Sequence, residues 1–360
     1  NTRIMLGIAM VLVISGCGSD KKKNEISSTD IRWTSYGVPH IKADNYTDLG
    51  EGLGYVMAKD RYCNVVGTIT TAKGERAKYL GPGVDNANVN LDFGYRHLGT
   101  YHQAINDFPN LDSRTQELMR GFASGFNYAI TNNQQFDNDC AIKLNAIDHL
   151  DVFTINLSMN YWPFIGEYIP NIGQAAPENQ QQGIRLFNRQ KSLVELAKGS
   201  NGWAIGKDMS SSQKGMILSN THLPHKDHFL WYEAHLTIPN ELNVYGGFLP
   251  GFLTPALGFN ETFSWTHTWS AATTGSLYAL TPTTEQNTSA NNIAYVYGDE
   301  TKVLSSQTYQ IEVKNSDGTI SEIERTLYSS DYGPMLTFDF DGLMLSVKDA
   351  PSQTSNKADF

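Results

Sequence analysis

The spacing of hydrophobic residues changes near the middle of this chain. A strand-like alternation over residues 30–43 comes first. Apolar residues then recur every three or four positions, which is the period of a helix with one buried face. This spacing predicts helices over 46–80, 112–131 and about 147–160, with Thr47 or Asp48 as the cap of the first. The first half of the chain is therefore expected to be mainly helical.

Residues 170–199 interrupt this pattern. They contain Pro170, Pro177 and a run of amides from Asn179 to Gln182, which predicts an exposed linker. From Asn201 onward, short apolar runs bounded by turn residues predict strands. These expected strands cover 203–206, 215–218, 228–238, 242–248, 255–259 and 263–268. A helical half joined through a linker to a strand-rich half predicts an α+β fold with layered sheets.

The first 17 residues have the pattern of a secretory signal. Arg3 precedes an apolar run that is too short to span a bilayer, and Ser15-Gly16-Cys17 follows it. Together with Ile14, this end of the run resembles the bacterial lipobox, which predicts a lipid on Cys17 and a place in the periplasm or at the outer membrane. An ordinary signal peptide that contains a cysteine is the alternative. Residues 18–29 are then expected to form a polar tether.

Two cysteines remain, Cys63 and Cys140. In an oxidising compartment they can form a disulfide if the fold brings them together. A buried free thiol at Cys63 is the alternative, and the sequence leaves both open.

The formal net charge of -10 bears on the class of partner. A nucleic-acid ligand calls for a basic surface, so the excess of carboxylates argues against one.

The segment Gly199-Ser200-Asn201-Gly202-Trp203 opens the strand-rich half directly after the linker. Taken alone, it is typical of a turn. If the chain were cut before Ser200, however, this serine would carry a free α-amino group, which titrates near pH ~8. The neutral amine could act as general base for the hydroxyl of its own residue. One residue would then supply both base and nucleophile, a variant of the catalytic triad.

Motifs on both sides of Ser200 share one order and spacing, from Tyr-Gly-Val-Pro-His-Ile at 36–41 to Trp-Thr-His-Thr-Trp-Ser at 265–270. The other segments are 52–55, 58–61, 199–203, 218–224, 231–236, 246–251 and 258–260. Together they resemble the penicillin acylase family of N-terminal nucleophile (Ntn) hydrolases, and most closely its acyl-homoserine-lactone acylase branch. The resemblance covers nearly all of the chain after the tether.

The resemblance implies an Ntn-hydrolase αββα sandwich made from a precursor that cuts itself after Gly199. Residues 30–169 would form a mainly helical α-subunit region, 170–199 the spacer, and 200–360 the N-terminal part of the β subunit. The family completes its oxyanion hole with an asparagine, helped by an arginine, and both would lie beyond Phe360. The resemblance therefore implies a fold truncated at its C-terminus and an N-terminal fragment with little activity of its own.

Three catalytic roles follow from the same resemblance. Ser200 matches the nucleophile, and His222 matches a histidine thought to contact the serine amine or hydroxyl. Trp269 matches the residue whose backbone N–H forms half of the oxyanion hole, where one donor is typically worth ~3 kcal/mol. Outside the resemblance, His222 is interpreted as a surface-turn histidine.

The predicted reaction is hydrolysis of the amide bond between an acyl chain and an amine. N-acyl-homoserine lactones are the preferred substrates, which would make the protein a quorum-quenching enzyme. Leu223, Trp162 and Phe164 are expected to contact the acyl chain. A penicillin or cephalosporin side-chain acylase is one alternative. An inactive surface lipoprotein that binds peptide or lipid is another.

No cofactor and no metal site is predicted. Residues 272–275 lack the aspartates that hold calcium in penicillin G acylases, and calcium needs charged oxygen ligands. The histidines do not have the spacing of a zinc site. The expected partners are a small N-acyl amide and the two subunits of one precursor, with a membrane contacted only through the lipid anchor.

Overall fold

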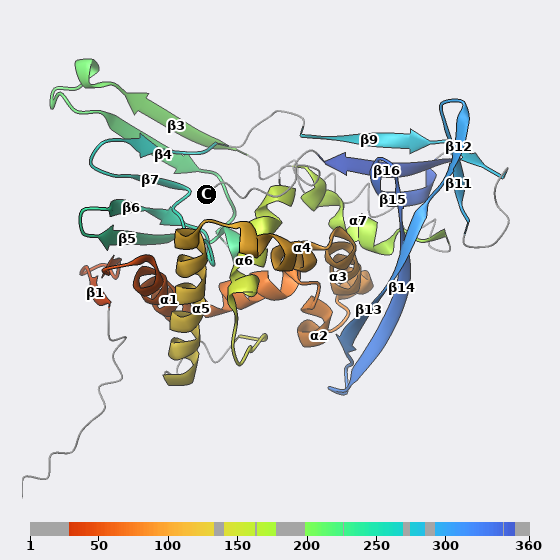
Figure 1. Cartoon of the computed structure of the whole chain (residues 1–360), viewed down its shortest axis with the longest axis horizontal. Coiled ribbons are helices and arrows are strands. Elements are labelled where there is room, and N and C mark those ends of the chain that lie inside the picture. The colour runs from red at the N-terminus through yellow and green to blue at the C-terminus, as the bar shows by residue number, and fades with distance from the viewer. Residues whose placement is uncertain are drawn as a thin grey trace, which may run out of the picture.

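The computed structural model describes residues 29–132, 140–162, 164–177, 199–225, 227–268, 274–284, 292–340 and 342–349. Within these ranges helices fill the first half and strands the second, so the predicted α+β class is confirmed (Figure 1). Among the helices of this described part, none combines the length and apolarity needed to cross a membrane. Cys17 and Trp269 lie outside the described residues.

The helical half differs in detail from the prediction. The helix expected over 46–80 ends at Ala72 because Gly74 adopts a φ of +65°, and the chain restarts as a second helix. Its cap is Asn45, whose side chain accepts the N–H of Asp48 at 2.9 Å, so the predicted caps are wrong. The described α-helices are α1 (Tyr46–Ala72), α2 (Arg76–Leu80), α3 (Ala87–Leu98), α4 (Thr100–Asp107), α5 (Ser113–Asn132), α6 (His149–Ser158) and α7 (Ile169–Gln174).

Helix α7 overlaps the start of the predicted linker. Ile169 and Ile172 are buried there, and Gly173 lies against the backbone of Asn90 in α3. The expectation of an exposed linker is therefore wrong for residues 170–174. Residues 178–198 lie outside the described part of the chain.

Buried polar groups shape α2 and α3, which the hydrophobic pattern did not separate. The Asp92 carboxylate on α3 accepts the backbone N–H groups of Arg76 at 2.9 Å and Ala77 at 2.6 Å. It thus caps α2, whose own cap residue Glu75 makes no side-chain capping bond. Burial raises the pKa of Asp92 to about 7, partly offset by these N–H donors. A helix start is set here by a residue from the next helix.

Helices α1 and α5 cross closely through paired glycines. Gly50 and Gly54 face the backbone of α5, and Gly121 and Gly125 face the backbone of α1. Each pair is four residues apart, so both glycines lie on one helix face. The absence of a Cβ lets the two backbones touch.

We expect Gly125→Ala to lower the free energy of unfolding by about 3 kcal/mol, because an added Cβ would overlap the backbone oxygen of Glu51. Urea denaturation measures the change. The matched control is Gly67→Ala in α1, where an added Cβ has nothing within 4 Å. That change should be neutral or stabilise by about 0.5–1 kcal/mol. Equal effects of the two substitutions would contradict this close packing.

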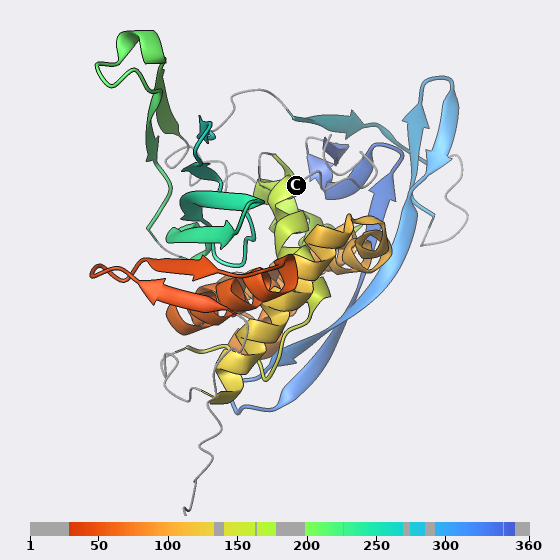
Figure 2. The same cartoon turned by 60° about the vertical axis from the view of Figure 1, so that its left-hand side comes forward.

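The largest sheet joins the two halves of the chain (Figure 2). Strand β2 pairs in parallel with β5, and all other neighbouring strands of this sheet pair antiparallel. One sheet face packs on the helices in a common core, and the other carries half-exposed side chains. Its order is β1 (Asp30–Trp33), β2 (Pro39–Lys42), β5 (Tyr232–Ile238), β6 (Leu242–Phe248), β7 (Leu257–Phe259) and β8 (Ser264–Trp265).

The remaining strands form smaller sheets. A separate hairpin contains β3 (Ser200–Ile205) and β4 (Met216–Thr221). A three-stranded sheet contains β10 (Pro282–Thr283), β11 (Ala294–Tyr297) and β12 (Glu300–Val303). A five-stranded sheet has the order β13 (Ser305–Lys314), β14 (Ile320–Ser330), β15 (Gly333–Phe340), β16 (Leu343–Asp349) and β9 (Gly275–Leu280).

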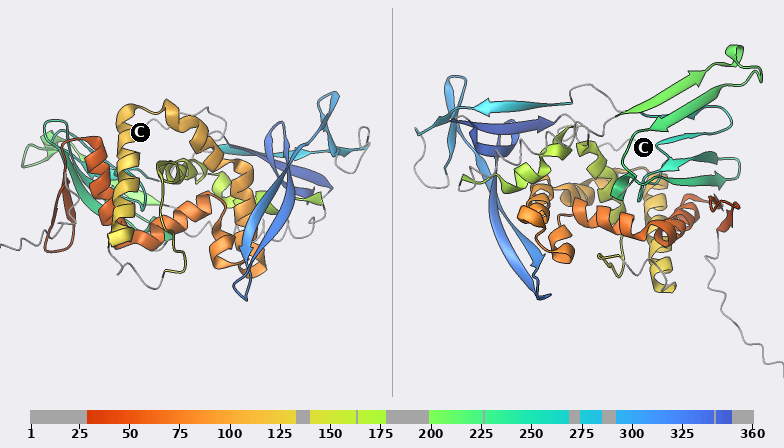
Figure 3. Two further views of the ribbon diagram at one scale, coloured as in Figure 1. Left: turned by 60° about the horizontal axis from the view of Figure 1, so that its bottom comes forward. Right: turned by 180° about the vertical axis from the view of Figure 1, so that it is seen from behind.

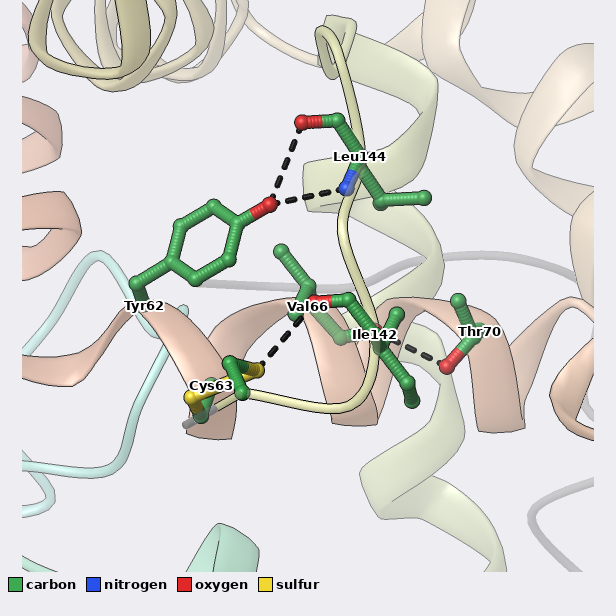
Figure 4. Close-up of a disulfide and its surroundings, with 7 residues drawn as sticks. Tyr62, Cys63, Val66, Thr70, Ile142 and Leu144 are labelled. Atoms are coloured by element: carbon green, nitrogen blue, oxygen red, sulfur yellow. Dashed lines mark hydrogen bonds between the residues drawn. A yellow bond between two sulfur atoms is a disulfide. The ribbon is translucent and has the colours of Figure 1, made fainter. Parts of the chain in front are cut away.

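Cys63 and Cys140 form a disulfide, which settles the alternative that the sequence left open (Figure 4). Their Cα atoms are 5.5 Å apart, within the usual range for a disulfide. Tyr62 directly precedes Cys63 in α1. Its hydroxyl donates to the carbonyl of Leu144 and accepts the N–H of Leu144. The disulfide and this tyrosine tie the segment around residues 140–144 to α1.

Candidate active site

Ser200 is the first residue of a strand, not part of a turn. It pairs directly with Thr221 in the β3–β4 ladder. The ladder continues one step further, because the His222 N–H donates to the carbonyl oxygen of Gly199 at 3.2 Å. The peptide bond between Gly199 and Ser200 is therefore held in extended backbone at a strand end.

The Ser200 hydroxyl lies beside the peptide bond between Gly199 and Ser200. Its Oγ donates to the Gly199 carbonyl oxygen at 2.5 Å, and the residue is half-buried. A hydrogen bond to this oxygen draws electron density from the carbonyl carbon. The arrangement brings the Ser200 hydroxyl next to the carbonyl group of the preceding residue.

His222 stands next to Gly199. Its Nδ1 lies 3.1 Å from where a Cβ on Gly199 would be. Successive residues of a strand point to opposite faces, so the Gly199–His222 pair and the Ser200–Thr221 pair face opposite sides of the hairpin. Within the described contacts, Ser200 and His222 share no hydrogen bond in this uncut chain. The expected contact with the serine amine stays a prediction for the cut chain.

The segment after β8 passes over β3. A Cβ at Gly202 would lie 2.6 Å from the Thr266 methyl group, so the missing side chain makes room for this segment. Thr266 precedes Trp269 by three residues, and Trp269 itself lies in the gap after residue 268, outside the described residues. The oxyanion role of Trp269 stays a prediction. Sequence analysis placed Gly202 in the 199–203 motif but gave it no role of its own.

A cleft of about 480 Å³ separates β4 from the outer face of the largest sheet. Thr221, Ser219 and Ile217 line one wall from a single face of β4. Because Thr221 lies opposite Ser200, the cleft opens on the face to which the Ser200 side chain belongs. The other wall consists of Trp231, Tyr232, Glu233, Tyr245, Gly246, Gly247, Leu257, Gly258 and Phe259.

The two tyrosine hydroxyls of this second wall are hydrogen-bonded to carboxylates. The Tyr245 hydroxyl donates to Glu233 Oε1 at 2.6 Å. Burial and this carboxylate raise the pKa of Tyr245 to about 12, so the hydroxyl keeps its proton. The Tyr232 hydroxyl donates to Asp60 Oδ2 at 2.8 Å, and burial also raises its pKa. These hydrogen bonds fix the positions of both tyrosine rings in the wall of the cleft.

The three predicted acyl-pocket residues lie in different surroundings. Trp162 lines a second cavity of about 480 Å³ near the disulfide, where its ring packs 4.8 Å from that of His228. Phe164 packs on Tyr168 and on the backbone of Gly275. Leu223 is half-buried just after His222. The cavity that Trp162 lines includes neither Phe164 nor Leu223, so their common role stays a prediction.

Comparisons with known proteins add to this geometry. The family model described as penicillin amidase matches residues 28–358. The acyl-homoserine lactone acylase PvdQ of Pseudomonas syringae pv. syringae (strain B728a) is 29% identical over 375 residues, covering 97% of this chain and 47% of that protein. The aculeacin-A acylase of Actinoplanes utahensis is 28% identical over 343 residues, covering 86% of this chain and 41% of that protein. The chain spans about half the length of these curated relatives.

Solved structures match as well. A thermostable penicillin G acylase from Alcaligenes faecalis, in tetragonal form, aligns with 23% identity and a TM-score of 0.35. The alignment covers 47% of this chain and 92% of that chain.

Proposed function

Because this chain belongs to the penicillin amidase family, we propose that its precursor cuts itself between Gly199 and Ser200 and then hydrolyses N-acyl amides with Ser200. The observation that carries the proposal is the Ser200 Oγ, hydrogen-bonded to the Gly199 carbonyl at the start of β3. Residues 30–169 would supply the helical α-subunit region, 170–199 the spacer, and 200–360 part of the β subunit. The open face of the largest sheet would become one inner face of an αββα sandwich.

The self-cutting step follows from this geometry. The Ser200 Oγ adds to the Gly199 carbonyl carbon, and the peptide C–N bond breaks. The acyl group moves to Oγ as an ester, and the released nitrogen takes the hydroxyl proton to become the α-amine of Ser200. Water then hydrolyses the ester, which frees the hydroxyl and leaves a carboxylate on Gly199. Since Gly199 has no side chain, the ring of His222 can stand beside the bond that is cut.

Hydrolysis of substrate repeats the same chemistry in the cut protein. The free amine takes the Ser200 hydroxyl proton while Oγ attacks the amide carbonyl. The Trp269 N–H stabilises the oxyanion, and His222 contacts the amine or hydroxyl. The α-amine passes this proton to the leaving nitrogen, and the amine half departs. Water then hydrolyses the acyl-enzyme ester, which releases the acid and restores the Ser200 hydroxyl.

We propose an acyl chain on a polar amine as the substrate, with N-acyl-homoserine lactones first. The support is the naming of two relatives as acyl-homoserine lactone acylase and aculeacin-A acylase. A penicillin or cephalosporin side-chain acylase is the second candidate, on the family match alone.

A panel of N-acyl amides tests the substrate, with release of the amine as the readout. The full-length gene product should cleave homoserine lactones with long acyl chains at least about tenfold more efficiently than phenylacetyl or glutaryl amides, since each buried methylene is worth ~0.8 kcal/mol. Reaction of only the phenylacetyl or glutaryl amides would favour the second candidate. A folded protein that stays in one piece and releases no amine would favour a binding lipoprotein.

We also propose that the protein works outside the cytoplasm, anchored in the periplasm or at the outer membrane by a lipid on Cys17. The disulfide between Cys63 and Cys140 supports this, because such bonds persist in oxidising compartments. Mass spectrometry of the mature N-terminal peptide tests it, and an unmodified Cys17 would contradict the anchor.

A further inference from the structure

We propose that the β13–β14 hairpin is the clamp that holds the two chains together after the cut. This inference rests on the proposed cleavage between Gly199 and Ser200, which would leave the hairpin on one chain and its supporting helices on the other. In Figures 1 and 3 the hairpin lies along α2 and α3, and it packs against both helices. The partner surface is therefore the α2–α3 region of the N-terminal chain.

The hairpin has little support from its own chain. It is joined to β15 only through the last two residues of β14, Ser329 and Ser330. Strand β13 is the edge of the five-stranded sheet, so within the described residues no further strand pairs with it. An isolated two-stranded hairpin is marginally stable in water. Packing on the helices must therefore stabilise the rest of the hairpin.

An apolar core seals the hairpin to those helices. All of its members are at most 3% exposed, and they come in equal numbers from the two sides of the cut. The helices supply Ala77, Val89 and Phe93, and the hairpin supplies Ile311, Val313 and Leu327. Separating the chains would expose both sets of apolar side chains to water, which is unfavourable in proportion to the apolar area exposed.

Arg325 on β14 reaches furthest into the helices. Its Nη1 donates to Asn90 Oδ1 at 3.0 Å and also to the carbonyl of Gly173. The guanidinium lies 4.5 Å from the centre of the Phe93 ring. One side chain thus combines charge-assisted hydrogen bonds with a cation–π contact across the junction. Gly173 belongs to the proposed spacer, and a single cut after Gly199 leaves it on the same chain as Asn90 and Phe93.

His97, at the end of α3, makes a second polar contact with the hairpin. Its Nδ1 lies 3.2 Å from the Tyr309 hydroxyl, and its Nε2 lies 2.9 Å from Ser329 Oγ. Burial lowers the pKa of His97 to about 4, so the ring is neutral at pH 7 and can hydrogen-bond as donor and acceptor. An ion pair between Lys78 and Glu312 at 2.5 Å lies on the exposed side and adds little.

The test measures how fast the two chains separate. A protease site placed within residues 178–198 of the full-length gene product yields two chains whether or not the protein cuts itself. Dissociation in moderate urea is followed by size-exclusion chromatography. We expect Arg325→Met to speed dissociation at least about tenfold, because it removes both charge-assisted hydrogen bonds and the cation–π contact.

The matched control is Lys302→Met, which removes a cation on β12 that pairs with Asp331 of the same chain. It should leave the dissociation rate unchanged. If Arg325→Met fails to fold, Arg325→Lys keeps the charge but loses the planar guanidinium over the Phe93 ring, and it should speed dissociation about threefold. Equal rates for the Arg325 and Lys302 variants would overturn the clamp. Failure of self-cutting is seen separately, as one intact mass in the protein without the added protease site.

Discussion

Ser200→Ala is expected to leave the full-length precursor in one piece and to lower amide hydrolysis by about 10⁴-fold or more. The substitution removes the Oγ that would attack both the Gly199 carbonyl and the substrate, and it leaves the backbone of β3 in place. Intact-mass spectrometry reads the first effect, and amine release reads the second. Circular dichroism should show an unchanged fold.

Ser212→Ala is the matched control for this experiment. Ser212 lies on the same hairpin region, in the exposed connection between β3 and β4. We expect this variant to be cut like the unaltered protein and to keep its activity. Normal cutting of Ser200→Ala would place the processing site elsewhere and remove the basis of the proposed function.

Loss of the disulfide is expected to have the largest effect on stability. Cys63 and Cys140 are 77 residues apart, and closing a loop of this length lowers the entropy of the unfolded chain by an amount worth about 4 kcal/mol. Replacing both residues by alanine should lower the free energy of unfolding by that amount. Alanine is chosen because Cys140 is buried, and a serine would bring in a hydroxyl.

Urea denaturation of the double variant measures this loss. The unaltered protein in excess reductant is the control, and it should show a shift of similar size. Both bonded residues precede Gly199, so the disulfide does not link the two chains of the cut protein. A loss below about 1 kcal/mol would mean that the contacts around residues 140–144, such as Tyr62 with Leu144, already hold the segment without the bond.

The predicted helices show which elements the local hydrophobic pattern can predict. The helix expected over 112–131 is α5, which runs over Ser113–Asn132, because its apolar residues keep one face over its whole length. Helices α3 and α4 were not predicted. Helix α3 buries Asn90 and Asp92, which form hydrogen bonds with other elements. Its buried face therefore includes polar residues and is not continuously hydrophobic. Hydrophobic periodicity cannot detect a buried polar face.

The strands were predicted only in part. The strand expected over 242–248 is β6, with the same bounds. Strands β9 to β16 were not predicted. The second half of β13 does alternate apolar and polar residues from Tyr309 to Lys314, and Ile311 and Val313 are buried, but this signal was not used in the prediction. The Asp317-Gly318 pair was the available hairpin signal, and Gly318 has the positive φ that such a turn needs.

The sequence by itself determined the division into a helical and a strand-rich half, the family, and the serine at the junction. These depend on residue types and spacings between near neighbours in the chain. Only the tertiary structure decided that Cys63 bonds Cys140, that Ser200 begins a strand, and that Arg325 anchors a hairpin on the helices. Each of these depends on which segments, distant in the sequence, come into contact. The pattern of hydrophobic and polar positions along the chain does not specify those contacts.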